Sequence, residues 1–277
     1  MLFIPQKGRW LTQHNLGTVG TVTPGTSLTT GGASSTKGTP VEIFASTNFD
    51  VCAVEIFAHS YFSNGADSRG CLDILIGTAT ESVLIPNLLM GACGSIAATD
   101  PGPKSWMFPL FIPAGSRIAA QVAGARISTA MYVWMRLYGG LISPPWRVGG
   151  KVETYGVGTV PNGTTITPGA SGAEGAWTEI TASSSRDHFC LVPSMQFGAD
   201  TTTSSRGLML DIGVGAATEE EVAQSFFYIT SGSENMAGPF GGHLPHCVDV
   251  PSGSRLVMRV SSSGTVDGTQ VALHGVS

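Results

Sequence analysis

The stretch "FIPAGSRIAAQV" (111–122) returns near the end of the chain as "DVPSGSRLVMRV" (249–260). When the two are aligned, Pro251 lies 138 positions after Pro113, and the Gly-Ser-Arg that follows keeps this spacing. After the Arg, apolar residues alternate with other residues in both stretches, which is the period of a strand with one buried face. A Pro and a Gly just before such a run predict a tight turn that leads into the strand. The sequence therefore contains the same turn and strand twice.

Further matches on either side of this pair extend the repeat over most of the chain. They keep the same order, and their spacing varies only between 136 and 144 positions. We therefore predict a tandem duplication, in which "LISPPWRVGGK" (141–151), with its two prolines and its Gly pair, is a short stiff linker. The predicted parts are an N-terminal arm (1–14), copy 1 (15–140), the linker (141–151) and copy 2 (152–277). The clearest further matches are "SRGCLDILIGTATE" (68–81) with "SRGLMLDIGVGAATE" (205–219), Glu42-Ile43 with Glu179-Ile180, and Leu137-Tyr138-Gly139 with Leu273-His274-Gly275.

Each copy is expected to be all-β. The segment "TEEEVAQSFF" (218–227) has a helix-start pattern, but its partner "TESVLIPNLL" (80–89) holds Pro86, so we expect both to be extended. Many short strands in about 125 residues indicate a β-sandwich, and we predict two tandem jelly-roll-like domains. An immunoglobulin-type sandwich is the alternative, but the chain lacks the expected Cys…Trp…Cys spacing. The strands predicted for copy 1 are 41–46, 51–58, 70–77, 82–90, 106–112, 116–123 and 130–138.

The composition argues against several classes of function. Charged residues make up 12% of the chain, the net charge is −5, and Lys and Arg do not cluster. This balance excludes the basic patch of a nucleic-acid-binding protein and gives no support for binding to anionic membranes. The apolar window 82–99 contains Pro86 and two glycines, so we do not expect it to cross a membrane. The low charge content indicates surfaces that face neighbouring subunits rather than water.

The chain has five cysteines at positions 52, 71, 93, 190 and 247. The number is odd and no C-x-x-C motif occurs, so we expect buried, reduced thiols rather than a disulfide framework. An intermolecular disulfide through one of them stays open.

Candidate sites were weighed against structural roles. "HLPHC" (243–247) offers two imidazoles and a thiolate, but Pro245 separates the histidines and copy 1 has no such ligands. Asp73 and Asp211 recur together with Arg69 and Arg206, and we interpret them as outward-facing charge pairs that fix strand ends. The sequence contains no P-loop, no G-x-S-x-G and no H-E-x-x-H motif. We therefore expect no catalytic residue, no cofactor and no metal site.

The candidate interaction residues are aromatic and aliphatic. In the arm, Phe3, Ile4, Trp10 and Leu11 would be costly to leave together in water, so they pack on copy 1 or on a neighbouring subunit. In the run "AMYVWMRLYG" (130–139), Trp134 lies on the polar side of the alternation and is a further candidate.

The strands "LDILIG" (72–77) and "LDIGVG" (210–215), the segment "FPLFIPAGSRIAAQV" (108–122) and the closing "VWMRLYGG" (133–140) carry a resemblance to a known group. In these features the chain resembles virion structural proteins of tailed bacteriophages. The resemblance implies a role in assembly as a head decoration, collar or tail-associated subunit located in the virion, with capsid, neck or tail proteins as partners. It implies no catalytic residues, because the matching positions belong to turns and strands.

The sequence thus favours a non-enzymatic structural subunit that forms a homo-oligomer. Three duplicated chains in a ring would present six similar lobes, and a trimer is therefore one arrangement to test. The alternative is a carbohydrate- or host-surface-binding module, in which Trp106, Trp134, Trp146 or Trp177 would stack on sugars. An enzyme comes third, because a polysaccharide hydrolase needs two carboxylates that face one cleft and no such pair stands out.

Overall fold

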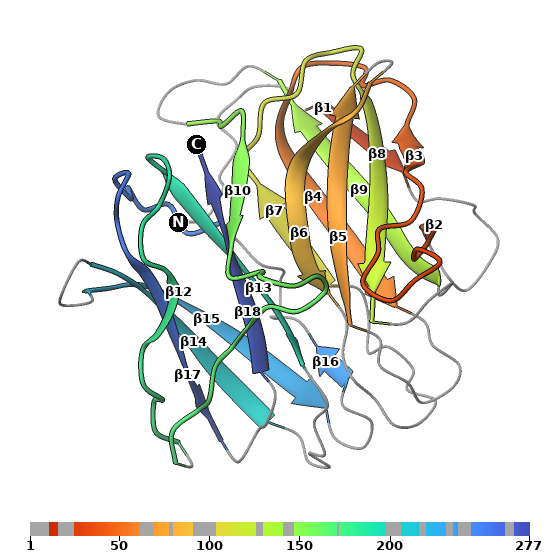
Figure 1. The fold of residues 1–277 in the computed structure, drawn as a ribbon. Coiled ribbons are helices and arrows are strands. Elements are labelled where there is room, and N and C mark those ends of the chain that lie inside the picture. The colour runs from red at the N-terminus through yellow and green to blue at the C-terminus, as the bar shows by residue number, and fades with distance from the viewer. Residues whose placement is uncertain are drawn as a thin grey trace.

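The structure is a computed structural model, and it describes residues 11–15, 25–60, 69–77, 80–90, 104–125, 130–140, 147–170, 172–197, 206–215, 220–230, 235–237, 245–263 and 269–277. These residues form two β-sandwiches that lie side by side (Figure 1), so the predicted all-β fold is confirmed. Within them, no helix has the length and hydropathy that a membrane crossing requires.

Domain 1 is a sandwich of two antiparallel sheets. One has the order β2-β9-β4-β7, with β1 on the same edge of β9 as β2, and the other has the order β3-β8-β5-β6. This is the strand order of a jelly roll, in which successive strands from β2 onward alternate between the sheets except at the β5-β6 hairpin. The strands are β1 (Leu11–Asn15), β2 (Thr26–Thr29), β3 (Val41–Phe44), β4 (Val51–Ser60), β5 (Gly70–Gly77), β6 (Ser82–Met90), β7 (Lys104–Phe108), β8 (Arg117–Gly124) and β9 (Ala130–Gly139).

Domain 2 repeats this order. Its sheets are β11-β18-β13, with β10 beside β11 on the edge of β18, and β12-β17-β14-β15-β16. The position of β7 is taken by an isolated bridge between Leu191 and His246. The strands are β10 (Val152–Tyr155), β11 (Thr164–Thr165), β12 (Thr178–Thr181), β13 (Cys190–Phe197), β14 (Arg206–Val214), β15 (Glu220–Thr230), β16 (Asn235–Ala237), β17 (Leu256–Ser262) and β18 (Thr269–Val276).

The turn before β8 shows why the repeated motif needs its residues. The Thr47 hydroxyl donates to the carbonyl of Pro113 at 2.8 Å and accepts the amide of Ser116 at 3.1 Å. Gly115 has φ of 82°, a left-handed conformation that glycine adopts without strain. The Pro-x-Gly-Ser stretch is therefore a turn tied to the strand-connecting loop at Thr47.

The turn before β17 has the same bonds. The Ser184 hydroxyl donates to the carbonyl of Pro251 at 2.9 Å and accepts the amide of Ser254 at 3.2 Å. Gly253 has φ of 86°. A hydroxyl, a proline carbonyl and a left-handed glycine in matching places show that the two copies fold alike at this turn.

The start of domain 1 differs from the predicted arm boundary. Residues 1–14 were expected to lie outside the repeat, but Leu11–Asn15 forms β1 and pairs with β9. In this ladder Thr12 lies opposite Tyr138, just as Thr154 of β10 lies opposite His274 of β18. The sequence "LTQHN" is mostly polar and does not predict a strand. It can be polar because β1 lies at the edge of the sheet.

The segment 218–227, which has the helix-start pattern, and its partner 80–89 both contribute extended strands, as predicted. β15 pairs with β14 along its length, and β6 pairs with β5 through two register shifts. Pro86 lies in β6, which is an edge strand, where a missing amide costs no ladder bond. Asn87 beside it has φ of 51°, which bends the strand.

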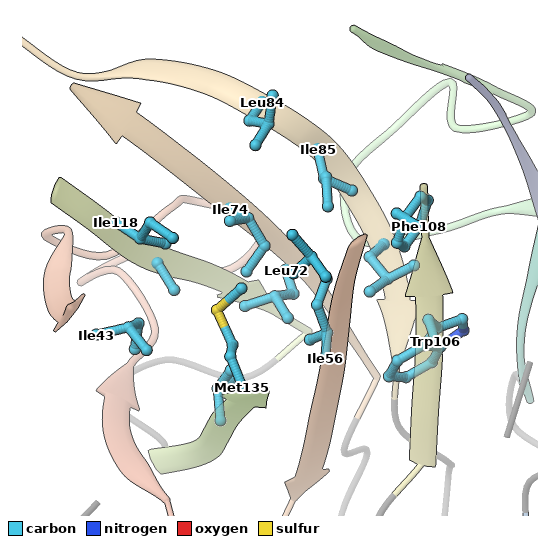
Figure 2. Packing of buried hydrophobic residues seen from close by; sticks show 14 of the residues in the cluster. Ile43, Ile56, Leu72, Ile74, Leu84, Ile85, Trp106, Phe108, Ile118 and Met135 are labelled. Carbon is cyan, nitrogen blue, oxygen red and sulfur yellow. The ribbon is translucent and has the colours of Figure 1, made fainter. Parts of the chain in front are cut away.

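The core of domain 1 lies between its two sheets, where Ile56, Leu72 and Trp106 point toward one another (Figure 2). A buried aromatic ring removes roughly 150–250 Å² from water, which stabilises the fold by about 4–6 kcal/mol before chain entropy is subtracted. Domain 2 has a separate core of its own, but four of its residues join the domain 1 cluster across the contact between the domains. They are Val152, Cys190, Val192 and Val276.

Candidate functional site

The second domain buries one outer sheet face against the first domain. The strands β10, β13 and β18 pack on β6, with β13 also reaching β7 (Figure 1). We call the outward side chains of these three strands the docked face. Because one side of β18 faces the core of domain 2 and the other faces domain 1, every residue of β18 is buried. The docked face consists of Val152, Thr154, Cys190, Val192, Ser194, Ala272, His274 and Val276.

A chain of hydrogen bonds crosses this contact. Thr154 Oγ1 donates its one hydrogen to the carbonyl of Pro86 at 2.5 Å, so it accepts from His274 Nδ1 at 2.8 Å. On the other side of the ring, Ser194 Oγ accepts the amide of Leu89 at 3.2 Å and lies 2.8 Å from His274 Nε2. With the ring hydrogen on Nδ1, Nε2 accepts from Ser194. The geometry thus assigns a neutral His274 with its hydrogen on Nδ1.

Burial lowers the pKa of His274 to about 3. Its ring also meets Phe108 edge-on, with centroids 5.9 Å apart and planes at 80°. A buried imidazole whose two nitrogens are both bonded cannot exchange a proton with a substrate at neutral pH. His274 therefore orients the two domains and does not serve as an acid or base.

The corresponding face of domain 1 carries a different set of groups. By ladder register, Glu55 opposite Arg136 corresponds to Ser194 opposite Ala272, and Tyr138 takes the place of His274. The Tyr138 hydroxyl donates to Glu55 Oε2 at 2.6 Å, and Arg136 Nη1 lies 3.3 Å from that oxygen. The Arg136 guanidinium also lies over the ring of Phe57, 5.7 Å from its centroid. We call Glu55, Phe57, Arg136 and Tyr138 the matching face.

Of the predicted interaction residues, two lie in the described part of the chain. Trp134 lies on β9 beside the matching face, but it is 9% exposed and stacks on Phe57 with centroids 5.3 Å apart and planes at 2°. This burial leaves no open ring face on which a sugar could stack. Leu11 is half-buried in β1. Phe3, Ile4 and Trp10 lie outside the described residues.

The recurring aspartates occupy the middle of the opposite sheet rather than strand ends. Asp73 on β5 is buried and accepts from Lys37 at 2.7 Å and from Gln121 at 2.9 Å. Asp211 on β14 is buried and accepts from Arg259 at 2.8 Å. Because Asp73 faces Gln121 and Asp211 faces Arg259 across equivalent ladders, the neutralising cation sits at different positions in the two copies.

The predicted placement of both aspartates at strand ends is therefore wrong, and Asp73 pairs with Lys37 rather than with Arg69. Arg69 instead donates to Asn162 Oδ1 at 2.9 Å, across the domain contact. The side chain of Arg206 lies outside the described residues.

Three carboxylates of domain 2 gather around one arginine. Glu174, Asp211 and Glu221 each offer an oxygen within 4.8 Å of the others, the spacing of a cation site. The guanidinium of Arg259 contacts all three, at 2.6 Å from Glu174, 2.8 Å from Asp211 and 3.0 Å from Glu221. It also lies over the ring of Trp177, 4.3 Å from its centroid. The arginine thus occupies the position that a metal ion would need.

A second polar cluster joins Glu153 to the loop before β13. Burial raises the pKa of Glu153, but hydrogen bonds from Ser185, Tyr155, Arg186 and Lys151 outweigh it and lower the pKa to about 2. The Ser185 hydroxyl binds this carboxylate, while His188 Nε2 lies 2.8 Å from the Tyr155 hydroxyl. A serine nucleophile needs its imidazole base as a direct partner, and these contacts do not supply one.

Domain 1 has a counterpart of this cluster without its titratable groups. Gln13 Oε1 on β1 accepts the amide of Asn48 at 2.9 Å, as the Tyr155 hydroxyl accepts the amide of Ser185 at 3.3 Å. The shared element is a side chain that ties the loop to the first strand. The Glu153 cluster is therefore a structural tie.

The "HLPHC" segment also has a structural role in its described part. The backbone of His246 pairs with Leu191 at 2.8 and 2.9 Å, and its Nε2 lies 2.8 Å from Ser225 Oγ. His243 lies outside the described residues.

The described cysteines have free thiols. Cys71 and Cys190 are buried, Cys52 is half-buried and Cys247 is exposed, while Cys93 lies outside the described residues. Burial raises the pKa of Cys71 to about 12, so its thiol stays protonated and unreactive.

No family model matches the chain, and no curated protein matches it. Among solved structures, the chain is similar to the N-terminal CBM22-1–CBM22-2 tandem domain of Xyn10C from Paenibacillus barcinonensis. The two are 12% identical, with a TM-score of 0.28 over 96% of this chain and 92% of that one. A likeness of this size carries no argument about function.

Proposed function

We propose that the chain is a non-enzymatic structural subunit of a tailed-bacteriophage virion, acting as a decoration, collar or tail-associated protein that assembles through its sheet faces. The docked face is the observation that carries this proposal. An outer sheet face of a jelly roll already serves here as a permanent protein contact, and its equivalent in domain 1 carries Arg136 with 42% of its side chain exposed.

The polar clusters of the described residues support a structural role. His274 is used in the domain contact, Arg259 neutralises Asp211, and Glu153 ties a loop. Each of these three side chains is thus bound by other residues of the fold. The chain would thus contribute surfaces to an assembly whose partners are other virion proteins and further copies of itself.

The experiment is mass spectrometry of purified virions from the phage that encodes this chain. We expect the protein in a fixed ratio to the major capsid protein. Complete particles that lack it would overturn the proposal.

A glycan array with the purified protein tests the carbohydrate-binding alternative. Two results together would favour this alternative over the structural role. They are specific glycan binding that Trp177→Ala abolishes, and absence of the protein from purified particles. Trp177→Phe, which keeps an aromatic ring, is the matched control.

A further inference from the structure

We propose that the outer edge of domain 2 at β14 and β15 is a docking surface for the matching face of a second copy of this chain. This inference rests on the proposed structural function and names the contact by which copies join. It starts from the contact that the two domains already make within one chain.

The ladder register identifies the residues that correspond between the two edges. Cys71 pairs with Leu89 across β5 and β6, and Met209 pairs with Phe226 across β14 and β15. On the other side of each strand, Cys71 pairs with Ala123 of β8 and Met209 pairs with Ser261 of β17. Met209 follows Cys71 by 138 positions, and Ser261 follows Ala123 by the same number. Phe226 is therefore the counterpart of Leu89, and Met209 is the counterpart of Cys71.

These counterparts differ in what covers them. Leu89 and Cys71 are fully buried, because Ala272 of the docked face packs on them in a small cluster. Phe226 is 46% exposed, and Met209 beside it is only partly buried. Among the described residues, β16 pairs with β15 only at positions 228–230, so no strand lies beside the part of β15 that carries Phe226. In the described part of the chain, Phe226 thus lacks the cover that domain 2 gives to Leu89, and it is the larger apolar side chain.

The partner face follows from the same correspondence. Ala272 packs on Leu89 in the domain contact, and its counterpart in domain 1 is Arg136. A copy of domain 1 placed on this edge of domain 2 would bring the Arg136 guanidinium to the ring of Phe226. A guanidinium over an aromatic face is a favourable pair, and Arg136 already makes one with Phe57. The small Leu–Ala pair inside the chain thus corresponds to a larger Phe–Arg pair between chains.

This contact is head-to-tail, because it joins two different surfaces. Such a contact leaves one free edge and one free face at the ends of every open oligomer. It therefore closes into a ring or grows into a filament. In a ring, alternating contacts within and between chains would place all lobes in similar surroundings.

Sedimentation velocity of the full chain, backed by native mass spectrometry, tests the proposal. Wild type is expected to form closed oligomers, whereas two variants are each expected to be monomeric: Phe226→Ser, which removes the ring without giving Arg136 a charged partner, and Arg136→Glu. A mixture of these two variants is expected to give a one-to-one dimer and nothing larger, because each retains one intact surface. Arg136→Gln, which keeps a polar side chain but loses the charge, should weaken association about tenfold.

Phe111→Ser is the matched control. Phe111 is 44% exposed and lies in the loop between β7 and β8, so the same change of residue should leave the oligomers intact. The urea midpoint of each variant shows whether it is folded. Phe226→Leu, which keeps an apolar side chain but removes the aromatic face, should weaken association about tenfold, as Arg136→Gln does.

Three results would overturn the inference. They are a wild type that stays monomeric, an Arg136→Glu variant that assembles normally, and a mixture that stays monomeric although both variants are folded. A monomeric protein that is nevertheless found in virions refutes this contact but not the structural function. Oligomers of a protein that virions lack refute the function but not the contact.

Discussion

Acidification should weaken the contact between the two domains through His274. In the folded chain the pKa of His274 is about 3, because the ring is buried. In the unfolded chain a histidine titrates near 6.5. The unfolded state therefore binds the proton first as pH falls, and stability is lost from about pH 6.5 downward until the folded ring titrates.

The magnitude follows from the two pKa values. Each pH unit between them removes about 1.4 kcal/mol, so lowering the pH from about 7 to about 4.5 should cost about 2.5 kcal/mol through this residue alone. The loss of stability arises from hydrogen bonds that the protonated ring cannot make. A proton on Nε2 would point at the hydroxyl hydrogen of Ser194, so that two donors would face each other. The Ser194 oxygen already accepts the amide of Leu89.

Urea unfolding followed by tryptophan fluorescence measures this loss at both pH values. The comparison variant is His274→Gln, whose amide can donate and accept but does not titrate. His188 and His246, whose pKa values burial also lowers, are present in both proteins, so their contributions cancel in the difference. Wild type should lose about 2.5 kcal/mol more than the variant. Equal losses within about 0.5 kcal/mol would refute the assignment of a neutral, buried His274.

Three further predictions concern other parts of the fold. Lys37→Glu should destabilise by about 3 kcal/mol, since it leaves the buried aspartate of β5 unpaired, and adding Gln121→Arg should restore at least half by copying domain 2; urea unfolding measures both. Thr47→Ala and Ser184→Ala should each cost about 1 kcal/mol by thermal unfolding, and costs that differ by more than twofold would contradict the equivalence of the two turns. Among the described thiols, that of Cys247 should react first with Ellman's reagent and the buried ones only after unfolding; rapid labelling of a buried thiol in native protein would contradict the packing.

The repeat made most strands of copy 1 predictable. The run 70–77 is β5, and 82–90 is β6, with the predicted bounds. Strand alternation and repeat spacing suffice for such strands because each has a continuous apolar face. The strands β1 and β2 were missed because they are four or five residues long and mostly polar, so that only pairing with β9 defines them.

The charge partners were not predictable from spacing. The sequence shows that Asp73 and Asp211 recur, but the cation comes from Lys37 in one copy and from Arg259 in the other. These lie on different sides of the aspartate in the chain, so alignment of the copies does not reveal the pair. A duplicated site can keep its charge balance while the residue that supplies the balance moves.

The domain contact left a signal in the sequence that alternation alone does not explain. In β18 the outward positions carry Ala272 and His274, where β9 carries Arg136 and Tyr138. A strand without charge on either side is typical of burial on both faces. Comparing the outward residues of the two copies would have identified the docked face before the structure did.

The difference between the two faces also sets an order of assembly. The docked face lies on the same chain as the edge that it covers, so its effective concentration is high and the domain contact forms as the chain folds. Its hydrogen-bond chain ends on the backbone of Pro86 and Leu89, and it is neutral throughout. The matching face keeps Arg136 and Glu55 partly in water, which a free surface needs for solubility. A folded chain thus presents one face that carries Arg136 and one edge that carries Phe226, which do not meet within the chain. In the proposed contact, a second chain brings them together.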